Sequence, residues 1–88
     1  VRFWITHIAG KPGTWQRGMG KTLLTDPPDV FVCGHSHILQ IERVKSLNNM
    51  LFINPGAAGR QGFHLVKTMV RLIIENEKTV QAEVVHLD

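Results

Sequence analysis

The sequence predicts an α/β fold, and three observations point to it. Two early segments, residues 2–6 and 29–33, are apolar without alternation, as expected of strands buried on both faces of a parallel sheet. Residues 15–25, which lie between them, can form a short helix. Later segments alternate apolar and polar residues, which is typical of half-buried strands. With 88 residues, the chain is one small α/β or α+β sandwich at most, or a piece of a larger one.

The first half of the chain reads as strand, loop, helix and strand. The strand over 2–6 ends at His7, and the glycines and the proline of 8–15 mark a loop. The helix predicted over 15–25 stops at the Pro-Pro pair of 27–28, because proline cannot continue a helix.

The second half of the chain predicts antiparallel strands joined by short turns. The turn residues are asparagine and glycine, which tolerate the backbone conformations that turns require. The expected elements are a strand over 39–45, a turn at 48–49, a strand over 50–54, a loop over 55–62, and a hairpin of 67–75 and 79–87 around 76–78.

Composition excludes several classes of protein. Hydrophobic residues make up 43% and charged residues 19% of the chain, which is too apolar for a disordered protein. No apolar run is long enough to span a membrane, so we expect no membrane association. The net charge of +3 comes from scattered residues, so no specific nucleic-acid binding is expected. The single cysteine, Cys33, excludes an internal disulfide and fits a cytoplasmic location.

The Gly-His-Ser-His sequence at 34–37 is the most informative stretch. On an extended segment His35 and His37 would point the same way, about 6.6 Å apart, which suits two metal ions about 3.5–4 Å apart. His7 ends the other apolar strand, and ligands of α/β sheets gather outside the carboxyl ends of strands. Three imidazoles without a carboxylate are an incomplete site. Asp26 and Asp29 lie at the opposite end of the strand over 29–33, so they do not complete this site.

Other polar residues have weaker signals. Arg60, in the glycine-held loop of 55–62, is a candidate for a bidentate phosphate contact, with a solvated loop arginine as the alternative. Asn54 is interpreted as a cap of the strand that it ends. His64 and His86 are interpreted as ordinary surface or packing residues.

Three motifs follow one another along the chain: Thr-His at 6–7, Gly-His-Ser-His at 34–37, and Asn-Pro-Gly at 54–56. In this order they resemble the calcineurin-like metallophosphoesterase superfamily, and most of all its small bacterial and archaeal phosphodiesterase branch. The resemblance implies that residues 1–88 are the C-terminal part of a two-sheet α/β/β/α metallophosphoesterase sandwich. The acidic motifs of the family's N-terminal half have no counterpart in this sequence.

The resemblance also implies a function for these residues. His7 and His35 would bind one divalent metal and His37 the other. Mn²⁺ is the expected ion, with Mg²⁺, Ni²⁺, Zn²⁺ or Fe²⁺ as alternatives. A hydroxide bridging the two metals would hydrolyse phosphodiesters or phosphomonoesters, and Arg60 would add a phosphate contact. Ile8 departs from the glycine that many relatives have after the first histidine, and this changes the fit of a substrate.

Two alternatives remain beside the phosphoesterase. A non-catalytic member of the same fold would act as a protein-interaction scaffold, and a structural zinc domain is the third possibility. The zinc domain is disfavoured because a closed site needs four ligands and Cys33 lies in a strand. We expect residues 1–88 alone to be inactive. Since their apolar strands lack cover, we also expect them to pair with a missing N-terminal half or to self-associate.

Overall fold

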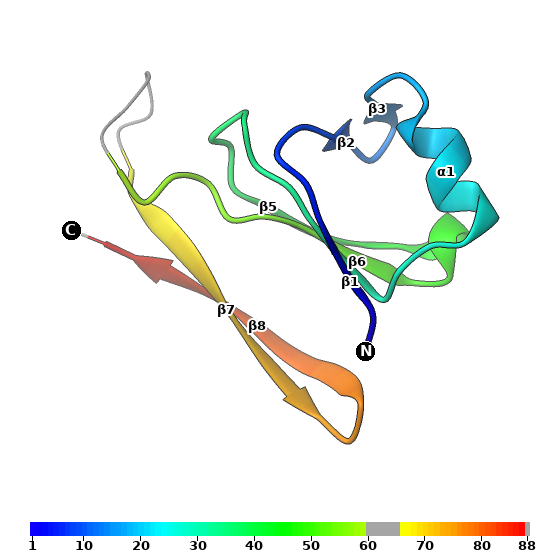
Figure 1. Ribbon diagram of the computed structural model, residues 1–88. Helices are drawn as coiled ribbons and strands as arrows, with labels where there is room; N and C mark the ends of the chain where they lie inside the picture. Colours follow the sequence, from blue (N-terminus) through cyan, green and yellow to red (C-terminus); the bar gives the residue numbers. More distant parts are fainter. Residues whose placement is uncertain (60–65, 88) are drawn as a thin grey trace.

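The computed structural model describes residues 1–59 and 66–87, apart from the side chains of 78–80. Its centre is a four-stranded sheet, which can be followed in Figure 1. The strands follow the order β1-β4-β6-β5. β1, β4 and β6 are parallel, and β5 is antiparallel to β6. Their bounds are Phe3–Ile5 for β1, Val30–Val32 for β4, Gln40–Val44 for β5 and Met50–Asn54 for β6. This mixed sheet confirms the predicted α/β class.

The sheet separates two cores, because alternate residues of β4 and β6 face opposite sides. Phe31 and Phe52 belong to the core on the side of helix α1. Val30, Leu51 and Ile53 form the core on the other side. All five side chains are at most 4% exposed, which explains why these segments are apolar without alternation.

Helix α1 spans Met19–Thr25 and begins later than the predicted residue 15. The prediction was wrong there because Thr14–Trp15 forms a strand, β3, paired with β2 at Gly10–Lys11. Gly13, with φ of +91°, makes the tight turn between the two strands, a conformation that glycine adopts at little cost.

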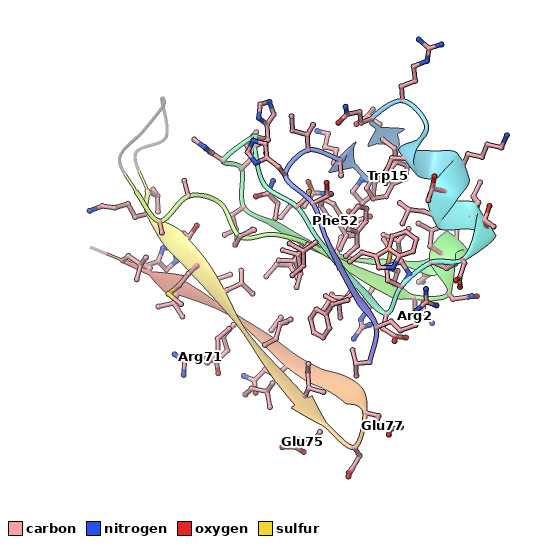
Figure 2. All side chains as sticks on the ribbon, in the orientation of Figure 1. Arg2, Trp15, Phe52, Arg71, Glu75 and Glu77 are labelled. Carbon is pink, nitrogen blue, oxygen red and sulfur yellow. The ribbon has the colours of Figure 1, made fainter. Side chains whose placement is uncertain are left out.

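The ring of Trp15 fixes the β2–β3 hairpin to the sheet. It stacks on Phe31 with ring centroids 5.9 Å apart, and it meets the edge of Phe52 at 5.4 Å (Figure 2). Aromatic pairs of this kind contribute about 0.5–1.5 kcal/mol beyond the area that they bury. The loop after β1 is therefore held firmly against one face of the sheet.

A second hairpin covers the opposite face of the sheet (Figure 1). It consists of β7 (Thr68–Glu75) and β8 (Lys78–His86), close to the predicted bounds. Val70 and Leu72 of β7 pack against the second core. The layers are thus helix, sheet and sheet, as the two-sheet sandwich requires, and no described helix covers the outer face of the hairpin.

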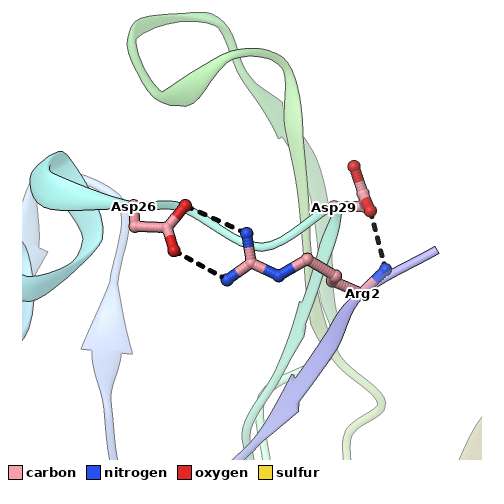
Figure 3. A network of polar contacts seen from close by, with 3 residues as sticks. All are labelled: Arg2, Asp26 and Asp29. Carbon is pink, nitrogen blue, oxygen red and sulfur yellow. Dashed lines mark hydrogen bonds and ion pairs between the residues drawn. The ribbon is translucent and has the colours of Figure 1, made fainter.

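β1 is an outer strand of the central sheet, and its side chains on the hairpin side have little cover. Phe3 is 40% exposed and Ile5 is 77% exposed, although their neighbours in β4 are buried or half-buried. The beginning of β1 is fixed by Arg2, whose guanidinium donates two hydrogen bonds, of 2.9 and 3.0 Å, to the Asp26 carboxylate (Figure 3). Among the described residues, no helix is long and apolar enough to cross a membrane.

Candidate functional site

The carboxyl ends of β1 and β4 lie at one end of the sheet because the two strands are parallel, and this brings two of the predicted histidines together. His7 follows β1, and His35 follows β4. Their ring centroids are 5.1 Å apart, with the edge of one ring toward the face of the other. The backbones stay paired beyond the strands, since the Gly34 N–H donates to the His7 carbonyl at 3.0 Å. The predicted convergence of these residues at one sheet edge is therefore present.

The backbone of the Gly-His-Ser-His loop is not extended, and the spacing argument for its two histidines was wrong. His35 has φ of +72° and His37 of +63°, both in the left-handed region. The loop bends at Ser36, whose N–H donates to the Gly34 carbonyl at 2.9 Å. Alternation of side chains does not apply to such a bend. Left-handed non-glycine residues cost about 1–3 kcal/mol each and cluster at functional sites.

Asn54, at the carboxyl end of β6, holds this loop in place. Its side chain is 3% exposed. Its Nδ2 donates to the Gly34 carbonyl at 3.2 Å and to Ser36 Oγ at 3.0 Å. Its Oδ1 accepts from the Gly56 N–H at 3.1 Å, which agrees with the interpretation of Asn54 as a strand cap. The contact with the histidine loop was missed, because nothing local to 54–56 indicates a partner 18–20 residues earlier.

Paired imidazoles at a sheet edge are suitable donors for a divalent ion, since histidine is the commonest metal ligand. The described residues contain no group of three or more His, Cys, Asp or Glu side chains placed to hold a metal. The two aspartates nearest in sequence lie at the opposite end of β4, where Asp26 binds the Arg2 side chain and Asp29 accepts from the Arg2 N–H at 2.7 Å. The donor set therefore fits part of a metal site that requires further ligands.

Two predicted residues fall outside the part of the chain that the structure describes, namely Arg60 and His64. Cys33 is 2% exposed, and its Sγ lies 3.8 Å from the Gly10 carbonyl oxygen. Burial raises the pKa of the Cys33 thiol. Cys33 belongs to the hydrophobic core on the side of α1, and its position there makes a structural zinc site weaker as an alternative.

A cavity of about 430 Å³ lies beside the histidine pair. One wall comes from residues 8–16, between β1 and α1, and the other from residues 34–40, between β4 and β5, with Phe52 contributing as well. His35 lines the cavity. The cavity was not predicted from the sequence. The feature that could have indicated it is Ile8, a large apolar residue directly after a candidate metal ligand.

Comparisons with known proteins agree with this arrangement. The family model of the calcineurin-like phosphoesterase superfamily domain matches residues 1–77. The crystal structure of a Vps29 single mutant from Entamoeba histolytica has the same fold, with a TM-score of 0.52 and 18% sequence identity. The match covers 92% of this chain and 53% of the other, so the chain spans about half of that protein's length. No curated protein matches. With most of its length matched by the family model, the chain belongs to the calcineurin-like phosphoesterase superfamily.

Proposed function

We propose that this chain provides part of the active site of a metal-dependent phosphoesterase that hydrolyses phosphodiesters or phosphomonoesters. The observation that carries the proposal is the His7–His35 pair, with ring centroids 5.1 Å apart at the carboxyl ends of two parallel strands. Membership of a phosphoesterase superfamily supports the same assignment. Ligands of open α/β sheets bind outside this end of the strands.

Each residue has a separate task in this proposal. His7 and His35 hold one divalent ion, and His37 holds a second. Mn²⁺ is the ion that we favour over Mg²⁺, Ni²⁺, Zn²⁺ and Fe²⁺. When bound, such ions supply positive charge to the phosphate oxygens and a nucleophile at neutral pH. Asn54 keeps the histidine loop in its bent conformation, and Arg60 adds a bidentate phosphate contact.

Mutation of the histidines in the full-length protein tests the proposal. His35→Ala and His37→Ala should each remove about one metal equivalent and most of the Mn²⁺-dependent hydrolysis of bis(p-nitrophenyl) phosphate, because each imidazole serves a different ion. His86→Ala is the matched control, since His86 is an exposed histidine on β8 and should leave both properties unchanged. A double variant of His35 and His37 that retained two metals per chain would contradict the assignment.

A non-catalytic scaffold is the second candidate, and the exposed apolar side chains favour it. Ile5 is 77% exposed and Ile38 is 66% exposed, both close to the end of the sheet that carries the histidines. A scaffold would have no need of the acidic ligands that the described residues lack. The metal analysis separates the two candidates, because a scaffold would bind no stoichiometric metal and would hydrolyse no ester.

The active enzyme also needs ligands from beyond residues 1–88. We propose that these residues form the C-terminal half of the domain and that the remaining ligands come from an N-terminal half or from self-association. Support comes from the uncovered side chains of Phe3 and Ile5 on the outer strand β1. Hydrolysis of bis(p-nitrophenyl) phosphate by residues 1–88 alone, at the rate of the full-length protein, would refute this. A cytoplasmic location is part of the same proposal.

A further inference from the structure

The cavity beside His35 has the walls of a site for an organic group. Ile8 and Ile38 are 41% and 66% exposed, so the cavity presents apolar surface to solvent directly next to the candidate metal ligands. Phe52 and the buried Ala9 add further apolar lining. A volume of about 430 Å³ is within the range of small-molecule sites. Inorganic phosphate alone would leave most of this surface without a partner.

The Lys11 ammonium in the cavity wall favours hydrogen-bond acceptors on a ligand and opposes a cation. Lys11 is the only residue with a formal charge among the lining residues, which include no carboxylate. Within residues 1–59 and 66–87, the side chains of Lys11, Thr14 and Gln16 make no hydrogen bond or ion pair and are available to a ligand. The Lys11 ammonium can only donate, whereas the Thr14 hydroxyl and the Gln16 amide can donate or accept. A cationic group would meet the Lys11 ammonium without compensation. A second phosphate group on the ligand would lose its hydration against the apolar side chains of Ile8 and Ile38, which offer it no hydrogen bond.

We propose that this cavity binds the leaving group of the ester, an uncharged organic group with an apolar body, the size of an aryl ring or a nucleoside, and with hydrogen-bond acceptors. The inference rests on the proposed phosphoesterase function and names the substrate class for that site. Because His35 belongs both to the cavity and to the histidine pair, a phosphate held at the histidines would direct its ester group into the cavity. Ile8 and Ile38 then determine specificity by contact with that group.

Binding of phosphonates tests the proposal without any need for turnover. Titration calorimetry on the full-length protein with Mn²⁺ compares methylphosphonate, phenylphosphonate and 2-aminoethylphosphonate. Phenylphosphonate should bind about tenfold more tightly than methylphosphonate, because its ring buries apolar surface in the cavity. 2-Aminoethylphosphonate should bind no better than methylphosphonate. The Lys11→Met variant should bind 2-aminoethylphosphonate about threefold more tightly than the unsubstituted protein, because the repulsion between the two ammonium groups is removed. Lys21→Met, on helix α1, should leave this affinity unchanged.

Ile38→Ser removes a large apolar side chain from one wall of the cavity, and Leu24→Ser is its matched control. Leu24 is 70% exposed on helix α1, so the two substitutions remove similar exposed apolar groups and neither disturbs a core. The preference for phenylphosphonate should fall to about threefold or less in Ile38→Ser and stay near tenfold in Leu24→Ser. Equal affinities for methyl- and phenylphosphonate, or an unchanged preference in Ile38→Ser, would overturn the cavity assignment alone. Failure of both phosphonates to bind would overturn the proposed function as well.

Discussion

Replacement of Asn54 by alanine tests how the histidine loop is held. The variant loses the two hydrogen bonds from Nδ2 to the loop, at 3.2 and 3.0 Å, and the one that Oδ1 accepts from the Gly56 N–H at 3.1 Å. The Asn54 side chain itself is 3% exposed, so its own polar atoms have little access to water in the folded protein. Three polar groups therefore lose a partner at once.

The expected loss of stability follows from these three contacts. A hydrogen bond contributes about 0.5–1.5 kcal/mol net, and an unsatisfied buried partner adds to the loss. Because Gly34 and Gly56 are half-buried, water replaces part of what is lost, and we expect a decrease of about 2–3 kcal/mol in the free energy of unfolding. The left-handed residues His35 and His37 should then relax, since each stores about 1–3 kcal/mol of backbone strain. The proposed metal site should then lose about tenfold or more in affinity for Mn²⁺, as metal sites do when groups that orient their ligands are removed.

Urea unfolding and Mn²⁺ titration of the full-length protein measure the two effects. Gln81→Ala is the control, because this exposed amide donates one hydrogen bond, to Glu83 at 2.9 Å, and its loss should cost less than about 0.5 kcal/mol. A decrease of less than about 1 kcal/mol for Asn54→Ala, with unchanged metal affinity, would show that the loop keeps its conformation without the side chain. The account given for Asn54 would then be wrong.

Three further predictions follow from local geometry. Gly56→Ala should decrease the free energy of unfolding by about 2 kcal/mol or more, because φ is +80° and the new Cβ would meet the Thr68 hydroxyl. Gly13→Ala is the control in the same urea unfolding: its φ is +91° but its Cβ would meet open space, so the decrease should be about 1 kcal/mol. The Cys33 thiol should resist a thiol reagent at pH 8 until urea unfolds the chain, since burial raises its pKa, and rapid labelling of the native protein would contradict the burial. The hydrogen bonds and charge of Arg2 lower the pKa of Asp26, so this pair stabilises the fold above about pH 4 and the contribution disappears as the pH falls through the lowered pKa. Unfolding measured between pH 2 and 6 should therefore show a smaller acid-induced loss in an Arg2→Met variant than in the natural protein.

Secondary structure could be predicted from the sequence where the hydrophobic pattern of a segment determines its conformation. Strand β4 is apolar without alternation because it is buried on both faces, as predicted, and the turn at Asn48–Asn49 was recognisable from residue type. The same interpretation of residues 2–6 was wrong, because β1 is an outer strand of the sheet and leaves Phe3 40% and Ile5 77% exposed. The start of the helix was not predicted correctly, because the pairing of Thr14–Trp15 with Gly10–Lys11 depends on the left-handed turn at Gly13. A two-residue strand has too short a pattern to compete with helix propensity.

The candidate site was predictable in position but not in conformation. The convergence of His7 and His35 followed from strand ends alone, because parallel strands place their carboxyl ends together. The left-handed backbone of His35 and His37 was not predictable, because histidine only occasionally adopts it and the constraint comes from a distant residue, Asn54. The cavity likewise depends on two loops that only the fold brings together.

The outer strand β1 connects the stability of the domain to its chemistry. β1 pairs with β4 on one side, and within the described residues no strand pairs with its other side. A strand that paired in parallel there would cover Ile5, which is 77% exposed, and would end beside His7. Because ligands gather at the carboxyl ends of such strands, the oxygen ligands that the histidine pair lacks are expected on the segment after that strand. The exposed edge of β1 is therefore also the edge from which the proposed metal site would receive its further ligands.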